Sequence, residues 1–103
     1  MDETLNQMLS AIQGQTKENW GAIKDTAGGF MQAKKERLEL LSSLRLQNEI
    51  DEDFFQKRLA EEKDILESEM HAMRVISKAA AQNAANAAMN VLQKAVNAAI
   101  RIV

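Results

Sequence analysis

The sequence predicts an all-α protein: a long helical hairpin with an amphipathic N-terminal arm, assembling as a helical oligomer. Three observations lead to this prediction. Apolar residues recur at helical spacing along most of the chain. The 103 residues include no proline. A turn flanked by helix-ending and helix-starting residues lies near the middle. A chain of this length forms one small domain at most.

Residues 1–33 are predicted to form the arm. Glycine at 14, 21, 28 and 29 weakens this helix, because each glycine costs about 1 kcal/mol relative to alanine. We therefore expect a flexible arm that breaks at Gly28–Gly29, although glycines spaced by seven would also offer a second helix a smooth face. The apolar stripe of the arm comprises Leu5, Met8, Leu9, Ile12, Trp20, Ile23, Ala27 and Phe30, with Trp20 packing inward.

Residues 34–78 are predicted to form a charged α-hairpin whose turn spans 47–51. Asn48 suits the left-handed conformation that closes a helix. Asp51 is a typical N-cap for the next helix. Ile50, just before the cap, is expected to pack on Phe55 as a hydrophobic staple. The chain should therefore reverse direction at this turn.

Residues 79–103 are predicted to form an Ala/Asn-rich assembly helix continuous with the preceding one. No helix-breaking residue occurs from Glu52 onward, so one helix of about 75 Å is expected. Its apolar arc is too wide for one neighbouring helix to cover, which predicts an oligomer interface. This interface comprises Ala84, Ala88, Val91, Leu92, Ala95, Ala99 and Ile102. The opposite polar arc contains Asn83, Asn86, Asn90 and Asn97, which suit helix contacts or a hydrated lumen better than open solvent.

Charge and composition limit the classes of partner that we expect for this chain. The net charge is −2, with acidic and basic residues interspersed, so no nucleic-acid partner is expected. The acidic N-terminus resembles no signal peptide, which predicts a cytoplasmic or virion-associated protein. Lys94, Arg101 and the amides disfavour a single membrane span, and only several copies with the polar arc inward would form a pore. A membrane partner is therefore not favoured.

The stretch from Leu38 to Leu66 resembles the SHOCT module, a short helical hairpin usually found at bacterial protein C-termini. Asn48 stands where that family usually has glycine, and Asp51 where it has threonine. The resemblance implies a bacterial or phage origin and an accessory, oligomerising role, and it supplies no catalytic residue. The features that carry it are Leu41, Leu44, Ile50, Glu52, Asp53, Phe55, Lys57 and Arg58.

The titratable residues predict neither catalysis nor a cofactor. His71 and Glu67 are candidate metal ligands, but di-metal bundles use Glu-x-x-His, and Ser68 occupies the position where the glutamate would stand. The chain has no cysteine and no nucleophile–base arrangement. The acidic residues at 61, 62, 64, 67 and 69 alternate with basic ones at spacings typical of surface ion pairs.

Together these patterns predict a non-enzymatic, self-assembling structural or accessory helical protein of bacterial or phage origin. Its expected partner is a second copy of itself, with other assembly proteins as further candidates. One alternative is a membrane-active or pore-forming oligomer acting through residues 79–103. A second alternative is a metal-binding helical bundle built on Glu67 and His71.

Overall fold

Four α-helices and one short 3-10 turn make up the part of the chain that the structure describes. The computed structural model describes the backbone of residues 2–102 and the side chains of residues 2–100. No strand occurs in this part, so the all-α prediction is confirmed. The elements are α1 (Asp2–Thr16), the 3-10 turn η1 (Lys17–Asn19), α2 (Trp20–Leu46), α3 (Glu52–Ala72) and α4 (Lys78–Ile102).

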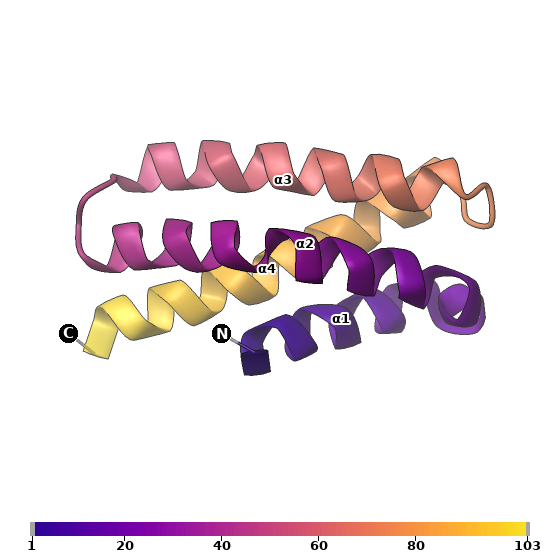
Figure 1. Cartoon of the computed structure of the whole chain (residues 1–103), viewed down its shortest axis with the longest axis horizontal. Helices are drawn as coiled ribbons and strands as arrows, with labels where there is room; N and C mark the ends of the chain where they lie inside the picture. Colours follow the sequence, from indigo (N-terminus) through magenta and orange to yellow (C-terminus); the bar gives the residue numbers. More distant parts are fainter. Residues whose placement is uncertain (1, 103) are drawn as a thin grey trace.

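The helices form a short bundle rather than a rod. α2 and α3 lie antiparallel as a hairpin, α4 crosses behind them, and α1 lies beside α2 and packs on α4 (Figure 1). The longest dimension of the bundle is 41 Å and the other two are 22 and 20 Å. The expected rod of about 75 Å is therefore wrong.

Each helix contributes its predicted apolar face to one core. Within α3, the residues at helical spacing on the inner face are buried, and Ile50, Leu9 and Trp20 pack partly buried against the same core. Fully burying a large apolar side chain contributes about 1.5–3 kcal/mol, so these stripes dominate the stability. The large core side chains are Leu5, Met8, Ile12, Ile23, Phe30, Met31, Leu38, Leu41, Phe55, Leu59, Leu66, Met70, Ile76, Met89, Leu92 and Val96.

The N-terminal segment is an ordered part of the bundle, contrary to the expected flexible arm. The helix breaks at η1, where Lys17 has φ 49°, and not at Gly28–Gly29. α2 runs without interruption across the predicted boundary at 33/34. Packing explains the difference, because Ile23, Ala27 and Phe30 are buried and hold α2 straight through its glycines.

The predicted continuity of the last two helices is also wrong. α3 ends at Ala72, and α4 begins at Lys78 after a joint of five residues, Met73–Ser77. Arg74 takes the left-handed conformation with φ 60°. The Ser77 hydroxyl accepts a hydrogen bond from the Ala80 N–H at 3.0 Å and caps α4. Folding α4 back buries its apolar face, which outweighs the about 1–2 kcal/mol cost of one left-handed residue.

Most of the described part of the wide apolar arc of α4 is covered within a single chain. Ala84, Ala88 and Leu92 are buried, and α4 packs against α1 and α3. Val91, Ala95 and Ala99 are half-buried, and the side chain of Ile102 lies outside the described residues. The argument that only an oligomer could cover this arc is therefore wrong. Self-association itself stays a prediction.

Candidate functional site

The turn of the α2–α3 hairpin is held by the two caps expected from its sequence. Asn48 is left-handed with φ 59°, its N–H donates to the Arg45 carbonyl at 3.1 Å, and the Glu49 N–H donates to the Leu44 carbonyl at 2.8 Å. These two bonds form a Schellman motif. The Asp51 carboxylate accepts from the Phe54 N–H at 2.8 Å and caps α3. The turn prediction is confirmed, and it aligns the two helices.

Glu52 ties the start of α3 to the end of α2. Gln56 donates to its carboxylate at 2.8 Å and Arg45 Nε donates at 3.0 Å. These two hydrogen bonds, the Gln56 bond first, lower the pKa of Glu52 below its usual 4.5. A lowered pKa in the folded state stabilises the protein above the unfolded value, and this stabilisation is lost as the pH falls through the folded pKa.

We expect Glu52→Gln to remove this pH-dependent contribution. The difference in unfolding free energy between wild type and variant should be constant near neutral pH and should shrink below about pH 4.5. Urea unfolding followed by circular dichroism at a series of pH values measures it. If the difference in unfolding free energy stays constant into strong acid, the pKa of Glu52 is not lowered in the folded protein.

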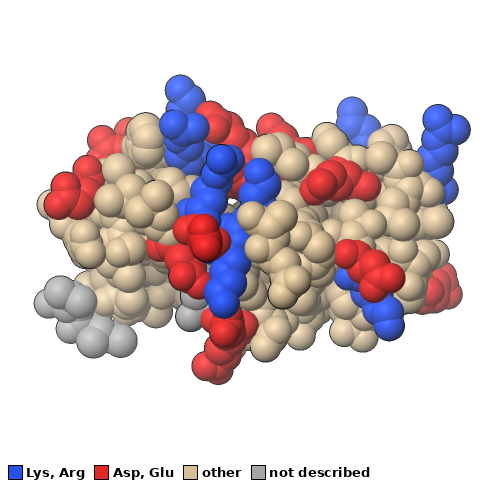
Figure 2. Space-filling view, viewed as in Figure 1, with Lys and Arg blue, Asp and Glu red and all other residues tan. Residues whose placement is uncertain are grey.

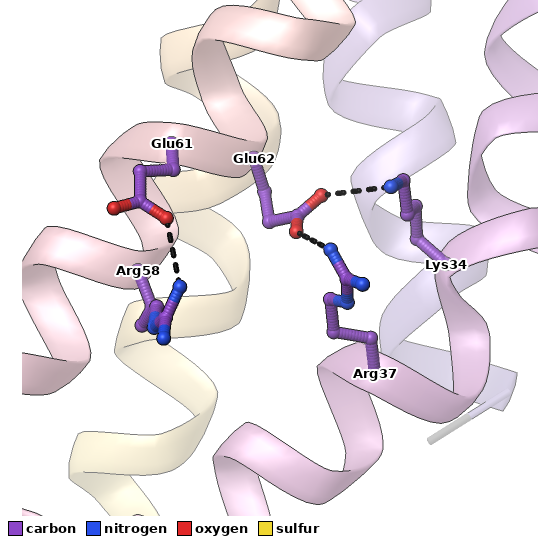
Figure 3. Close-up of polar contacts among 5 residues, drawn as sticks. All are labelled: Lys34, Arg37, Arg58, Glu61 and Glu62. Atoms are coloured by element: carbon purple, nitrogen blue, oxygen red, sulfur yellow. Dashed lines mark hydrogen bonds and ion pairs between the residues drawn. The ribbon is translucent and has the colours of Figure 1, made fainter.

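Glu62 is a buried carboxylate between α3 and α2. Its side chain points from α3 towards α2, where Arg37 and Lys34 reach it (Figure 3). Arg37 donates to Oε1 at 2.9 Å, and Lys34 Nζ lies 3.6 Å from Oε2. Glu62 is only 4% exposed, and Oε2 has no hydrogen-bond partner among the described residues. The pair of cations compensates the buried charge and links the hairpin across its middle.

Sequence reasoning missed this residue, because it grouped Glu62 with surface ion pairs. Glu61 does form such a pair, with Arg58 at 3.1 Å. Glu62, however, follows Phe55 by seven residues and precedes Leu66 by four, so it lies on the buried stripe of α3. That spacing is the signal that identifies it.

The outer face of the hairpin exposes large apolar side chains next to this cluster. Leu40 on α2 is 59% exposed, and Phe54 on α3 is 42% exposed. Arg58 lies over the Phe54 ring, 5.2 Å from its centre, which is a cation–π contact. A groove of about 330 Å³ runs between the two helices here. It is lined by Arg37, Leu40, Leu41, Leu44, Phe54, Arg58 and Glu62.

Charged side chains are spread over this face of the molecule. Lys and Arg side chains form a band across its middle with Asp and Glu beside them, and further charged groups lie towards both ends (Figure 2). Arg37, Arg58 and Glu62 are the charged residues that line the groove beside Leu40 and Phe54.

A second and larger groove lies between α1 and α2. It has a volume of about 650 Å³, and an ion pair of 2.7 Å joins Asp2 and Lys35 along it. The hydrogen bond and charge of Lys35 lower the pKa of Asp2, and Asp2 in turn raises the pKa of Lys35. Gly28 and Gly29 also line the groove, and a methyl group added at either would meet open space. On the predicted smooth face, Gly14 and Gly21 are exposed and Gly28 is half-buried. Apart from the adjacent residues and the backbone of the same helix, no described atom lies within 4 Å of a Cβ added at any of the three.

The predicted polar arc of α4 lies at the surface. Asn83 and Asn90 are exposed, and Asn86 and Asn97 are half-buried. Asn86 and Asn90 line a shallow groove of about 180 Å³ between α3 and α4. The amides therefore face outward from the bundle rather than into its core.

The alternative sites find little structural support. His71 is exposed in the last turn of α3, and Glu67 is half-buried one turn earlier. Within the described residues, no group of three or more His, Cys, Asp or Glu side chains is arranged to hold a metal ion. No described helix combines the length and apolar character needed to cross a membrane.

Comparisons with protein-family models, with curated proteins and with solved structures found no match to this chain. The resemblance of residues 38–66 to the SHOCT module therefore stays a prediction. The hairpin geometry that the resemblance implied is present, but capped helical hairpins occur in many unrelated proteins.

Proposed function

We propose that this chain is a non-enzymatic, self-assembling helical protein whose copies pair through the outer face of the α2–α3 hairpin. One observation carries the proposal: the exposed stripe of α3 formed by Phe54, Arg58, Glu61 and Ile65. All four side chains are exposed, at spacings of four, three and four residues. The order apolar, basic, acidic, apolar places complementary groups at mirrored positions along the helix.

A second copy fits this stripe when its α3 lies antiparallel. A two-fold axis midway between Leu59 and Ala60 places Phe54 against the partner's Ile65. The same axis places Arg58 against the partner's Glu61, so each end is apolar and the centre is charge-complementary. Such a two-fold contact uses the same patch on both copies, which is the commonest symmetry of homo-oligomers.

The expected affinity is modest. The stripe covers about three helical turns, and exposed ion pairs contribute about 0–1 kcal/mol each. Most of the binding free energy must therefore come from Phe54, Ile65 and the neighbouring Leu40, which is 59% exposed. Stable interfaces bury about 1,200–2,000 Å² in total. A stripe of about three helical turns is a smaller contact than this, so we expect a weak dimer whose population depends on concentration.

Replacing the two apolar residues of the stripe by serine tests whether two copies pair through it. Phe54→Ser combined with Ile65→Ser should raise the dissociation constant at least about tenfold, since both side chains lose their burial on each side of the axis. Light scattering over a dilution series measures the mass. Leu46→Ser is the matched control, because Leu46 is 41% exposed but lies outside the stripe. An equal effect of both variants, or a wild-type chain that is monomeric throughout, would refute the proposal.

Charge reversal gives an independent check of the antiparallel register. Arg58→Glu alone should weaken the dimer, and adding Glu61→Arg should restore it, because the reversed pair meets its reversed partner. The double variant also keeps the intrachain pair of Arg58 and Glu61. A double variant as weak as the single one would contradict this register.

A further inference from the structure

The joint between α3 and α4 contains none of the residues that most often interrupt a helix. Residues 73–77 contain no glycine, proline or asparagine. Arg74 is nevertheless left-handed, with φ 60°, and its N–H donates to the His71 carbonyl at 3.0 Å. At the α2–α3 turn the equivalent position is Asn48, which tolerates this conformation. Arginine tolerates it less well, so the closed joint carries backbone strain.

A helical joint would remove this strain. Both flanking segments are already helical, so extending the helix through the joint requires no new nucleation. Met73 and Val75 are 39% and 41% exposed in the closed joint, so they would lose little packing, whereas Ile76 is buried in the core and would have to repack. The Thr26 hydroxyl donates to the Met73 sulfur at 2.7 Å, but sulfur is a weak acceptor.

Opening the joint would expose the apolar face of α4 and the surface of α1 and α3 against which α4 packs. The buried residues on this face of α4 include Ala84, Ala88 and Leu92. The buried residues of α1, the helix against which α4 packs, include Met8 and Ile12. α4 is the last helix described, and it lies on the surface of the bundle without passing through a loop (Figure 1). It can therefore separate from α1 and α3 without unfolding the other helices, provided that the α4 of another copy replaces it.

We propose that two copies of this chain exchange their α4 helices. In the exchanged dimer, α3 and α4 of each copy join into one helix. Each α4 then packs on α1 and α3 of the other copy. The contacts that α4 makes with α1 and α3 are re-formed between the two copies, so the equilibrium depends on the joint strain, on the packing of Ile76 and on the entropy of association. The exchange uses the inner face of α4 rather than the outer stripe of α3, and is thus independent of the pairing proposed above.

Two substitutions at one position shift this equilibrium in opposite directions. Arg74→Gly relieves the left-handed strain and weakens the open helix, because glycine is a poor helix former. Arg74→Ala keeps the strain and strengthens the helix. We expect the dissociation constant of the exchanged dimer to be at least about tenfold higher for Arg74→Gly than for Arg74→Ala, since two joints contribute. Ser77→Ala, which removes the α4 cap, should favour exchange as Arg74→Ala does.

Spin labels distinguish exchange from face pairing. The chain has no cysteine, so single cysteines at Asp64 and Asn90 label α3 and α4 cleanly. Labelled chains are unfolded and refolded with an excess of unlabelled chains at high concentration, so that each distance reports on one chain. A closed chain keeps the two labels within about 25 Å, whereas a continuous helix separates them by about 39 Å.

The expected result is a population at the longer distance that grows from Arg74→Gly through wild type to Arg74→Ala. Phe54→Ser with Ile65→Ser should leave this population unchanged while weakening face pairing. If Arg74→Ala and Ser77→Ala, both helical by circular dichroism, show only the short distance at every concentration, exchange does not occur. A dimer in which all variants keep the short distance would likewise overturn the proposal.

Discussion

Phe55→Ala should lower the free energy of unfolding by about 3–5 kcal/mol. Phe55 is 0% exposed and belongs to the core formed by all four helices. Removing its ring leaves a cavity that the hairpin cannot close, because the caps at Asn48 and Asp51 hold the adjoining turn in place. Domains of this size have total stabilities of about 5–15 kcal/mol, so the loss approaches the whole stability of a marginal one.

The neighbouring residue supplies the control. Phe54→Ala changes the same side chain one position along α3, but Phe54 is 42% exposed. It should cost no more than about 1 kcal/mol, mainly through the lost contact with Arg58. Urea unfolding of both variants at low concentration measures the difference. Similar losses for the two variants would mean that the inner and outer faces of α3 are wrongly assigned.

Removing both cations around Glu62 should be nearly as destabilising. Lys34→Met combined with Arg37→Met leaves a carboxylate that is 4% exposed without a compensating charge. Breaking a buried ion pair on one side typically costs about 3–5 kcal/mol. The loss should lie near the lower limit, because the Arg37 side chain is 60% exposed and water partly screens its charge.

A third substitution in this background identifies the cause. Adding Glu62→Leu to Lys34→Met and Arg37→Met removes the stranded charge and should recover most of the stability, since apolar replacement of a whole buried pair is often neutral or stabilising. Thermal and urea unfolding measure all three variants. A triple variant no more stable than the double one would show that the two cations act through packing rather than charge.

The hairpin turn illustrates what local chemistry predicts well. Asn48, Ile50 and Asp51 are adjacent in sequence, and their preferences depend on backbone geometry within a few residues. The structure contains both expected caps at hydrogen-bonding distance. The helical faces were predicted for the same reason, because the periodicity of Phe55, Leu59 and Leu66 is a property of one helix.

The end of α3 illustrates the opposite case. Residues 73–77 contain no glycine or proline, and Arg74 is a poor choice for a left-handed position, so only Ser77, the N-cap of α4, marks the break. The break exists because α4 gains burial against α1, a helix far away in the sequence. The same distant packing keeps α2 helical through Gly28 and Gly29. Local propensity is worth about 1 kcal/mol per residue, and burial of several core side chains exceeds it.

The sequence alone thus determined that the protein is all-α, which face of each helix is apolar, and where the α2–α3 hairpin turns, because these depend on interactions within a few residues. Only the tertiary structure decided that α4 folds back on α1, that its alanine face is covered within one chain, and that Glu62 is buried between Lys34 and Arg37. Those outcomes depend on contacts between helices distant in sequence, whose combined burial outweighs the local preferences of the joint.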